Sequence, residues 1–288
     1  MTKTSTRGDL LVLAAALIWG VAFYFQKTAM FHIGPLLFLG LRALIGAIAL
    51  APFAVCEHQQ SDTKIRAVLP IALCGGLVFF TAASIQQFGI VTTTVINTGF
   101  LTALYVVATP FLYWLIERKR PALHVWIAVA VAFSGVLALE GGSLGDMSRG
   151  DLLVAIAAIF WGLHMVVVGY SGRLRRPLTY TCVSFSLVAL ISLSLALVFE
   201  PVELDAIYGA LDSILYVGVL SSALTFGMMA VALQYIPAPR ATVLLSVEVL
   251  FSAMAGYFFL QERLDLLAWF GGSLIVFAIL IVRFKESE

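Results

Sequence analysis

The sequence predicts an all-α, polytopic membrane protein, with ten transmembrane helices arranged as two inverted five-helix repeats. Three observations indicate this fold class. Hydrophobic residues make up 61% of the 288 positions and charged residues only 11%, whereas ordinary soluble domains have about 45–50% and about 25%. The apolar residues fall into stretches long enough to cross a bilayer. The first and second halves of the chain also share sequence.

Each predicted span contains about 20 largely apolar residues, the length that a helix needs to cross roughly 30 Å of hydrocarbon. The first span is too long for the apolar part of a signal peptide and has no evident cleavage site, so we expect it to be retained. Only short turns and tails remain outside the spans, so any function must lie among the helices. The ten predicted spans are 9–30, 34–56, 67–90, 94–115, 121–140, 150–172, 178–199, 209–235, 239–260 and 264–284.

Basic residues set the expected orientation, because Lys and Arg are kept on the cytoplasmic side of a membrane. With the N-terminus inside, only Arg149 and Arg263 fall outside, while Lys27 and Arg42 lie within spans. We therefore expect a multi-pass protein of the inner (plasma) membrane with both termini in the cytoplasm. The expected cytoplasmic set is Lys3, Arg7, Lys64, Arg66, Arg118, Lys119, Arg120, Arg173, Arg175, Arg176, Arg240, Arg283 and Lys285.

Charge and cysteine usage exclude several other classes of protein. The 17 basic and 16 acidic residues give a net charge of +1, which leaves no strong field to attract nucleic acid. Cys56, Cys74 and Cys182 lack the spacing of metal ligands or of a disulfide framework. The four histidines are far apart, and no nucleophile stands beside a base. We expect no cofactor, no metal and no enzymatic activity; an intramembrane enzyme is the distant alternative.

An internal repeat divides the chain into residues 1–145 and 146–288. Residues 9–20 read DLLVLAAALIWG and residues 151–162 read DLLVAIAAIFWG, with eight identities in twelve positions. Because each half holds five spans, an odd number, the second half must insert upside down relative to the first. Inverted repeats are typical of alternating-access transporters, whose substrate site lies near the membrane midplane between the repeats.

Further motifs support a family resemblance. They are LIWG at 17–20, IFWG at 159–162, Pro35 with Arg42, GFLTALYVVATPFLYWLIERKRP at 99–121 and TVLLSVEVLFSAMAGYFFLQERLDLLAWFGG at 242–272. The chain resembles the drug/metabolite transporter superfamily, in particular its EamA-type ten-helix exporters. It differs from them at Val249, because the family usually has a proline after the acidic residue of span nine.

The resemblance implies a transporter of small molecules, but relatives are described as moving amino acids, drugs, sugars or nucleotide sugars. The bacterial aromatic amino-acid exporters are the most similar group. This implies export of small neutral metabolites, with aromatic and other large neutral amino acids foremost. A nucleotide-sugar or other metabolite or drug carrier is the alternative.

Ionisable residues within the spans are candidates for function, because they are costly in hydrocarbon. Arg42 and Glu248 each lie eight or nine residues into their spans, near the midplane. They form either a substrate-coordinating or gating pair, or an ion pair that only locks two helices together. Lys27 lies close to the end of span one. It either extends its amine to the interface or places a charge at the outer mouth.

Polar and aromatic residues supply the remaining candidates. Thr98, Thr102, Tyr105 and Thr109 have the spacing of one helical face. His164 either couples proton movement to transport or forms hydrogen bonds in a pocket. Such a lining suits a flat apolar body with a few polar atoms, whereas an anionic substrate requires several Lys or Arg. The candidate substrate-binding residues are Trp19, Phe23, Phe80, Ser84, Gln87, Asn97, Thr98, Thr102, Tyr105, Trp161, His164, Thr225 and Met229.

Overall fold

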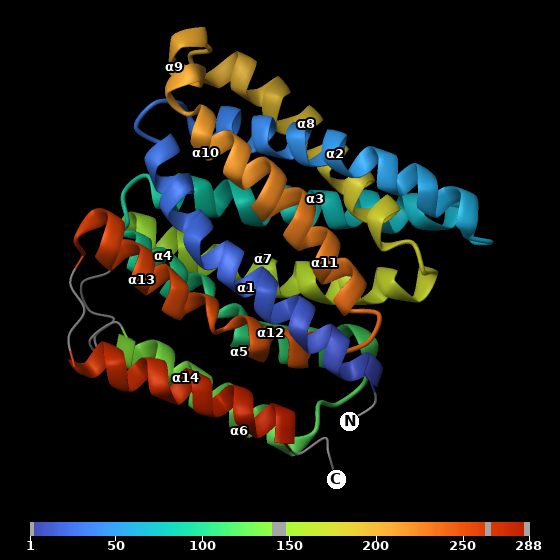
Figure 1. Ribbon diagram of the computed structural model, residues 1–288, viewed down its shortest axis with the longest axis vertical. Coiled ribbons are helices and arrows are strands. Elements are labelled where there is room, and N and C mark those ends of the chain that lie inside the picture. The colour runs from blue at the N-terminus through green and yellow to red at the C-terminus, as the bar shows by residue number, and fades with distance from the viewer. Residues whose placement is uncertain (1–2, 140–147, 263–265, 285–288) are drawn as a thin grey trace.

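A computed structural model describes residues 3–139, 148–262 and 266–284 of the chain. All regular elements within these residues are helices, which confirms the predicted all-α fold (Figure 1). Eight segments are long and apolar enough to cross a membrane, and two shorter apolar helices occupy the fifth and tenth predicted positions. The predicted boundary between the halves, at residues 145 and 146, lies outside the described residues.

The element bounds agree with the predicted spans to within a few residues at most ends. The first half contains α1 (Lys3–Ala29), α2 (Pro35–Gln60), α3 (Ile65–Ile90), α4 (Val95–Thr102), α5 (Tyr105–Glu117) and α6 (Leu123–Leu139). The second half contains α7 (Arg149–Ser171), the short 3₁₀-helix η1 (Gly172–Leu174), α8 (Pro177–Phe199), α9 (Leu204–Gly209), α10 (Leu211–Leu215), the π-helix η2 (Tyr216–Leu224), α11 (Thr225–Ala232), α12 (Ala238–Leu245), α13 (Glu248–Leu260) and α14 (Leu266–Phe284).

Spans four and nine are each broken into two helices, which the sequence did not predict. Between α4 and α5, the Leu104 amide bonds to Leu101 O at 3.2 Å, three residues back. Between α12 and α13, the Val249 amide bonds to Ser246 O, also at 3.2 Å. A tight turn of this kind within a helix often marks a hinge. Span nine is therefore broken before α13 even though residue 249 is valine and not proline.

The broken helices are matched between the two halves. α5 and α13 start 143 residues apart, and each has 13 residues. The residues that follow them, Arg118 and Gln261, have left-handed backbone φ values of 56° and 57°. The structure therefore carries, at equivalent positions, the repeat that the sequence indicated.

Two glutamates tie α2 and α8 together reciprocally. The Glu57 carboxylate, near the end of α2, accepts from the amides of Leu178 at 3.2 Å and Thr179 at 2.7 Å at the start of α8. The Glu200 carboxylate, which follows α8, accepts from the amides of Leu36 and Leu37 at the start of α2, at 2.9 and 2.8 Å. An anion at a helix N-terminus is favourable because the first amides lack helical partners. Each helix thus caps the other.

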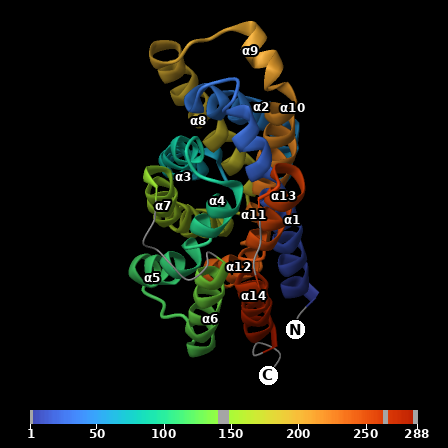
Figure 2. The same cartoon turned by 90° about the vertical axis from the view of Figure 1, so that its left-hand side faces the viewer.

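The helices form an elongated bundle (Figure 1). α2 and α8, with α9 beside them, lie at one end of its long axis, and the packed pair α6 and α14 lies at the other (Figure 2). The remaining helices lie between these pairs. α1 begins and α14 ends on the same side of the bundle, which we call the terminal side (Figure 1). The other face, where α1 leads into α2, is the opposite side.

Candidate functional site

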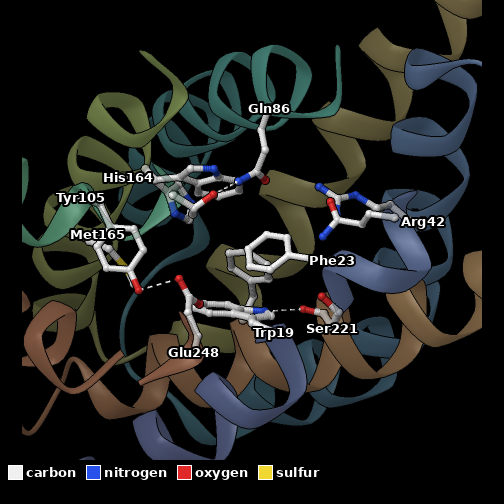
Figure 3. A pocket seen from close by; sticks show the side chains of 13 residues that line it. Trp19, Phe23, Arg42, Gln86, Tyr105, His164, Met165, Ser221 and Glu248 are labelled. Atoms are coloured by element: carbon white, nitrogen blue, oxygen red, sulfur yellow. Dashed lines mark hydrogen bonds between the residues drawn. The ribbon is translucent and has the colours of Figure 1, made fainter. Parts of the chain in front are cut away.

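A small cavity lies between the two halves of the bundle (Figure 3). Its volume is about 50 Å³, enough for a few waters, because one water needs about 10–15 Å³. The cavity is therefore too small to hold an amino acid in this conformation, which we call closed. Its lining residues are Trp19, Phe23, Gln26, Arg42, Gln86, Thr102, Tyr105, Trp161, His164, Met165, Ser221, Phe226 and Glu248.

The cavity contains part of the predicted site. The candidates that line it are Trp19, Phe23, Arg42, Thr102, Tyr105, Trp161, His164 and Glu248. The candidates outside its lining are Phe80, Ser84, Gln87, Asn97, Thr98, Thr225 and Met229. The lining residues absent from the predicted set are Gln26, Gln86, Met165, Ser221 and Phe226. A polar residue within a span was the available signal for both glutamines, and Met165 lies at the repeat equivalent of Phe23.

The break in span four divides its four predicted site hydroxyls between two helices. Thr102 and Tyr105 flank the break and line the cavity. Thr98 donates its hydroxyl to the carbonyl of Thr94 on its own helix, at 2.7 Å. Thr109 is fully buried, and its Oγ1 lies 3.1 Å from the position that a Cβ on Gly162 would occupy. The predicted stripe of four hydroxyls is thus divided between α4 and α5, and Thr102 and Tyr105 are its members in the cavity lining.

The other candidates outside the lining have different surroundings. Gln87 donates to the carbonyl of Gln26 at 3.3 Å, and Thr225 donates to that of Ser221. Met229 is buried in the main apolar core, and Phe80 packs against two smaller apolar clusters. Ser84 has a buried hydroxyl without a partner.

Arg42 and Glu248 line the same cavity but have separate partners. Arg42 Nη1 donates to Gln26 Oε1 at 3.3 Å, and its guanidinium lies 5.9 Å from the ring centres of Phe38 and Phe79. Glu248 Oε1 accepts from the Tyr105 hydroxyl at 2.8 Å. The two charged side chains lie on different sides of the cavity, with Phe23 between them in this view (Figure 3). The predicted ion pair between them is not formed in this conformation.

The contact of Tyr105 with Glu248 joins equivalent positions of the two halves. These residues are the first of α5 and α13, and they are 143 positions apart. Trp19 and Trp161 are likewise equivalent, at an offset of 142. Arg42, by contrast, has Ser184 as its equivalent at that offset. The scaffold of the cavity is thus symmetric, while its charged groups are not.

Aromatic side chains form one wall of the cavity. Phe226 lies 4.7 Å from Trp19 and 5.0 Å from Phe79, and Phe79 lies 5.1 Å from Trp161, between ring centres. Trp19 Nε1 donates to the carbonyl of Ser221 at 2.9 Å, within η2, and π-helical turns are frequent at functional sites. The neighbouring donor Trp161 Nε1 is buried without a protein partner. These tryptophans are lining groups rather than interfacial anchors.

Lys27 caps a helix instead of facing the cavity. Its ammonium donates to the carbonyls of Ile90, Val91 and Thr93, at 2.9, 3.0 and 2.8 Å. These carbonyls lie at and just beyond the C-terminus of α3, where a cation is favourable. The charge of Lys27 therefore stabilises the end of α3.

The terminal side of the bundle is held by a buried ion pair. Arg240 on α12 donates to Asp9 on α1 through Nε at 3.0 Å and Nη2 at 2.8 Å. Both side chains are buried. Arg240, which we expected on the cytoplasmic side, is the third residue of α12 and faces Asp9. We call this pair the terminal latch.

The opposite side has an equivalent contact made of different residues. Asp151, at the start of α7, accepts from the Thr93 hydroxyl and from Asn97 Nδ2 at 3.3 Å. Asp151 follows Asp9 by 142 positions, and Arg240 follows Asn97 by 143. We call Asp151, Thr93 and Asn97 the opposite latch. Each latch thus joins an aspartate at the start of one half to a residue of the other half, and the positions used are equivalent in the two latches.

Apolar spans around an enclosed and partly polar cavity are the architecture of a membrane transporter. The sequence model of the EamA-like transporter family matches residues 6–140 and 148–284. The chain therefore belongs to the EamA-like transporter family.

Several known proteins are similar to this chain over nearly its whole length. An uncharacterized transporter of Archaeoglobus fulgidus is 27% identical, covering 96% of this chain and 86% of its own. The uncharacterized transporter YwfM of Bacillus subtilis is 28% identical, with 95% and 93% covered. The uncharacterized inner membrane transporter YedA of Escherichia coli is 24% identical, with 94% and 89% covered. A crystal structure with 15% identity has a TM-score of 0.77 over 97% of both chains, and so shares the fold.

Proposed function

We propose that this transporter exports small neutral metabolites, foremost aromatic and other large neutral amino acids, across the inner membrane by alternating access. The observation that carries the proposal is the arrangement of the cavity, in which a cation and a carboxyl group lie apart with aromatic side chains nearby. The resemblance to EamA-type exporters supports the direction of transport.

The two charged residues suit the two charges of a zwitterion. Arg42 has a buried Nε with no hydrogen-bond partner in the part of the chain that the structure describes, and this nitrogen is available to a substrate carboxylate. Among the described residues, Tyr105 is the hydrogen-bond partner of the Glu248 carboxyl group, which is available to an ammonium group. A zwitterion has no net charge, so it fits a lining with one permanent cation.

The aromatic wall suits the side chain of the substrate. Trp19, Phe226 and Trp161 present flat apolar surfaces beside the charged groups. Aromatic pairs add about 0.5–1.5 kcal/mol beyond the burial of area. We therefore expect phenylalanine, tryptophan and leucine to be transported better than alanine.

Alternating access supplies the space that the closed cavity lacks. A second cavity, of about 280 Å³, lies on the terminal side and includes Val166, the neighbour of the central residue Met165. We propose that the terminal side is cytoplasmic and that substrate enters by this route when the terminal latch opens. Release then follows opening of the opposite latch, as the repeats 1–145 and 146–288 rock against each other about the breaks in spans four and nine.

The main alternative is an anionic substrate such as a nucleotide sugar. Phosphate groups are usually held by several Lys or Arg side chains. Of the 13 lining residues, Arg42 is the one Lys or Arg. The lining therefore favours the zwitterion over the anion.

Uptake by proteoliposomes tests the proposed function. Vesicles containing the purified protein are preloaded with unlabelled substrate, and entry of labelled phenylalanine, leucine, alanine and UDP-glucose is compared. We expect exchange of phenylalanine and leucine, and a loss of at least tenfold in Arg42→Gln. Arg66→Gln, which changes an exposed residue at the start of α3, is the control and should exchange normally. Exchange of UDP-glucose but no amino acid would contradict the proposal.

A further inference from the structure

Glu248 is a buried carboxyl group with little to balance a negative charge. It is 2% exposed and lies at the start of α13, directly after the break in span nine. Among the described residues, its side chain accepts a hydrogen bond from Tyr105, a neutral donor. Among the residues that the structure describes, no Lys, Arg or His lies within ion-pair distance of Glu248. An ionised carboxylate in such a place is costly unless it is paired.

The groups around Glu248 do not remove this cost. Arg42 lies across the cavity and donates to Gln26. His164 shares the lining but lies against Phe79, 5.4 Å between ring centres. The helices that contact α13 most are α1 and α4. α4 has no titratable residue, and those of α1 lie toward its two ends: Lys3, Arg7 and Asp9 at the start, Tyr24 and Lys27 at the end. Asp9 is paired with Arg240, and Lys27 donates to carbonyls at the end of α3.

We propose that Glu248 holds a proton when the cavity is empty and releases it when the ammonium group of the substrate binds. This inference rests on the proposed function, because it requires a substrate with an ammonium group. In the step, the O–H bond of the Glu248 carboxyl breaks, and the proton passes to water. The carboxylate keeps the electron pair and forms an ion pair with the ammonium group. No oxidant, reductant or cofactor is needed.

Tyr105 positions the carboxyl group for this exchange. Its hydroxyl donates to one oxygen of Glu248 in the closed structure and can continue to do so when the group is ionised. A hydrogen bond to a charged acceptor is stronger than one to a neutral acceptor. The hydrogen bond from Tyr105 therefore reduces the free-energy cost of ionising Glu248, and it does so without a cation from the protein.

Transport coupled to protons follows from this exchange. On the cytoplasmic side the substrate displaces the proton, and on the outer side the substrate leaves and a proton takes its place. Each cycle then moves one neutral amino acid outward and one proton inward. An inward proton gradient can therefore drive export against a substrate gradient.

Calorimetry measures the exchange directly. Binding of phenylalanine to the purified full-length protein is measured in two buffers that differ in ionisation enthalpy, which gives the number of protons released. We expect about one proton per bound phenylalanine in the native protein and in Glu248→Asp, and none in Glu248→Gln. His164→Gln should still release the proton, which distinguishes the two titratable groups of the cavity.

The outcomes separate the two proposals. Binding without proton release in the native protein, or release that persists in Glu248→Gln, overturns the proton exchange and leaves the proposed function standing. Absence of binding by every amino acid tested overturns both. A second measurement uses proteoliposomes with an imposed pH gradient. We expect uphill phenylalanine accumulation in the native protein, its loss when a protonophore collapses the gradient, and its loss in Glu248→Gln; accumulation that survives either change overturns the proton exchange.

Discussion

The two ends of the bundle are closed at equivalent positions by different chemistry. On the terminal side, the Arg240 guanidinium donates two hydrogen bonds to the Asp9 carboxylate. On the opposite side, the equivalent carboxylate of Asp151 meets the neutral donors Thr93 and Asn97. Two changes account for the difference: Asn97 is matched by Arg240, and Thr93 by the apolar Ile236, each 143 positions later.

This difference implies unequal gates. Breaking a buried ion pair by removing one partner costs about 3–5 kcal/mol, because a buried charge is left uncompensated. Hydrogen bonds between a charged group and neutral partners contribute about 1.5–3 kcal/mol. Asp151 also has a second role, since it caps α7 in a reciprocal contact with Ser148. We therefore expect loss of one partner to open the terminal side more than it opens the opposite side.

A cysteine placed at equivalent positions on the two sides of the bundle can report when each side opens. Thr98 on α4 and Ala241 on α12 are 143 positions apart and both are buried. Thr98→Cys and Ala241→Cys, each in a background with the three native cysteines replaced by serine, should react with a membrane-impermeant maleimide only when their side opens. The labelling rates of the two variants then show how readily each side of the bundle opens, and the two rates can be compared directly.

The largest effect is expected for Arg240→Ala. The variant leaves Asp9 buried without its cation, so the closed terminal side should lose about 3–5 kcal/mol. We expect labelling at Ala241→Cys to rise by at least 100-fold and phenylalanine transport to fall. The double variant Asp9→Leu with Arg240→Leu removes both charges and should return labelling toward the native rate. Labelling of the single variant at the native rate would show that the pair does not hold the gate.

A smaller effect is expected for Asp151→Asn. The amide keeps the shape of the side chain but loses the charge that strengthens the bonds from Thr93 and Asn97, which costs about 1.5–3 kcal/mol. Labelling at Thr98→Cys should rise by about tenfold or more, while labelling at Ala241→Cys should not rise. Equal changes at both probes would indicate general unfolding instead of opening on one side.

Asn97→Arg should make the two latches alike. Asn97 is half-buried and contacts Asp151, so the guanidinium can reach the carboxylate. We expect labelling at Thr98→Cys to slow by about tenfold, which corresponds to about 1.4 kcal/mol, and transport to slow because the outer side opens less often. Asn97→Gln, which adds length without charge, is the control. Faster labelling in the arginine variant would argue against the predicted ion pair.

The smallest effect is expected for Lys27→Met. Lys27 holds the carbonyl of Thr93, so it supports the opposite latch from behind as well as capping α3. A cation at a helix C-terminus contributes about 0.3–1 kcal/mol at exposed sites. We expect a lower melting temperature of a few degrees, measured by thermal shift in detergent, and at most a threefold rise in labelling at Thr98→Cys. Complete loss of transport would instead place Lys27 on the substrate path.

The sequence by itself determined the spans, the repeat and the rarity of charge within the membrane. Apolar runs of helical length and the paired DLLV segments are local patterns, so they can be read without knowing which helices touch. The same scarcity singled out Arg42 and Glu248 as residues near the midplane, and both line the cavity. Apolar lining residues such as Phe226 gave no such signal, because core and cavity side chains look alike in sequence.

Only the tertiary structure decided which of these groups meet. Asp9 and Arg240 are separated by 231 positions, and Tyr105 and Glu248 by 143, so no periodicity links them. The breaks in spans four and nine also escaped prediction, because no proline or glycine marks them and the tight turns arise where helices of the two halves pack together. Hydropathy determines which segments cross the membrane, whereas contacts between side chains determine which helices pack together. Those contacts also make the site asymmetric, although the two halves share one scaffold.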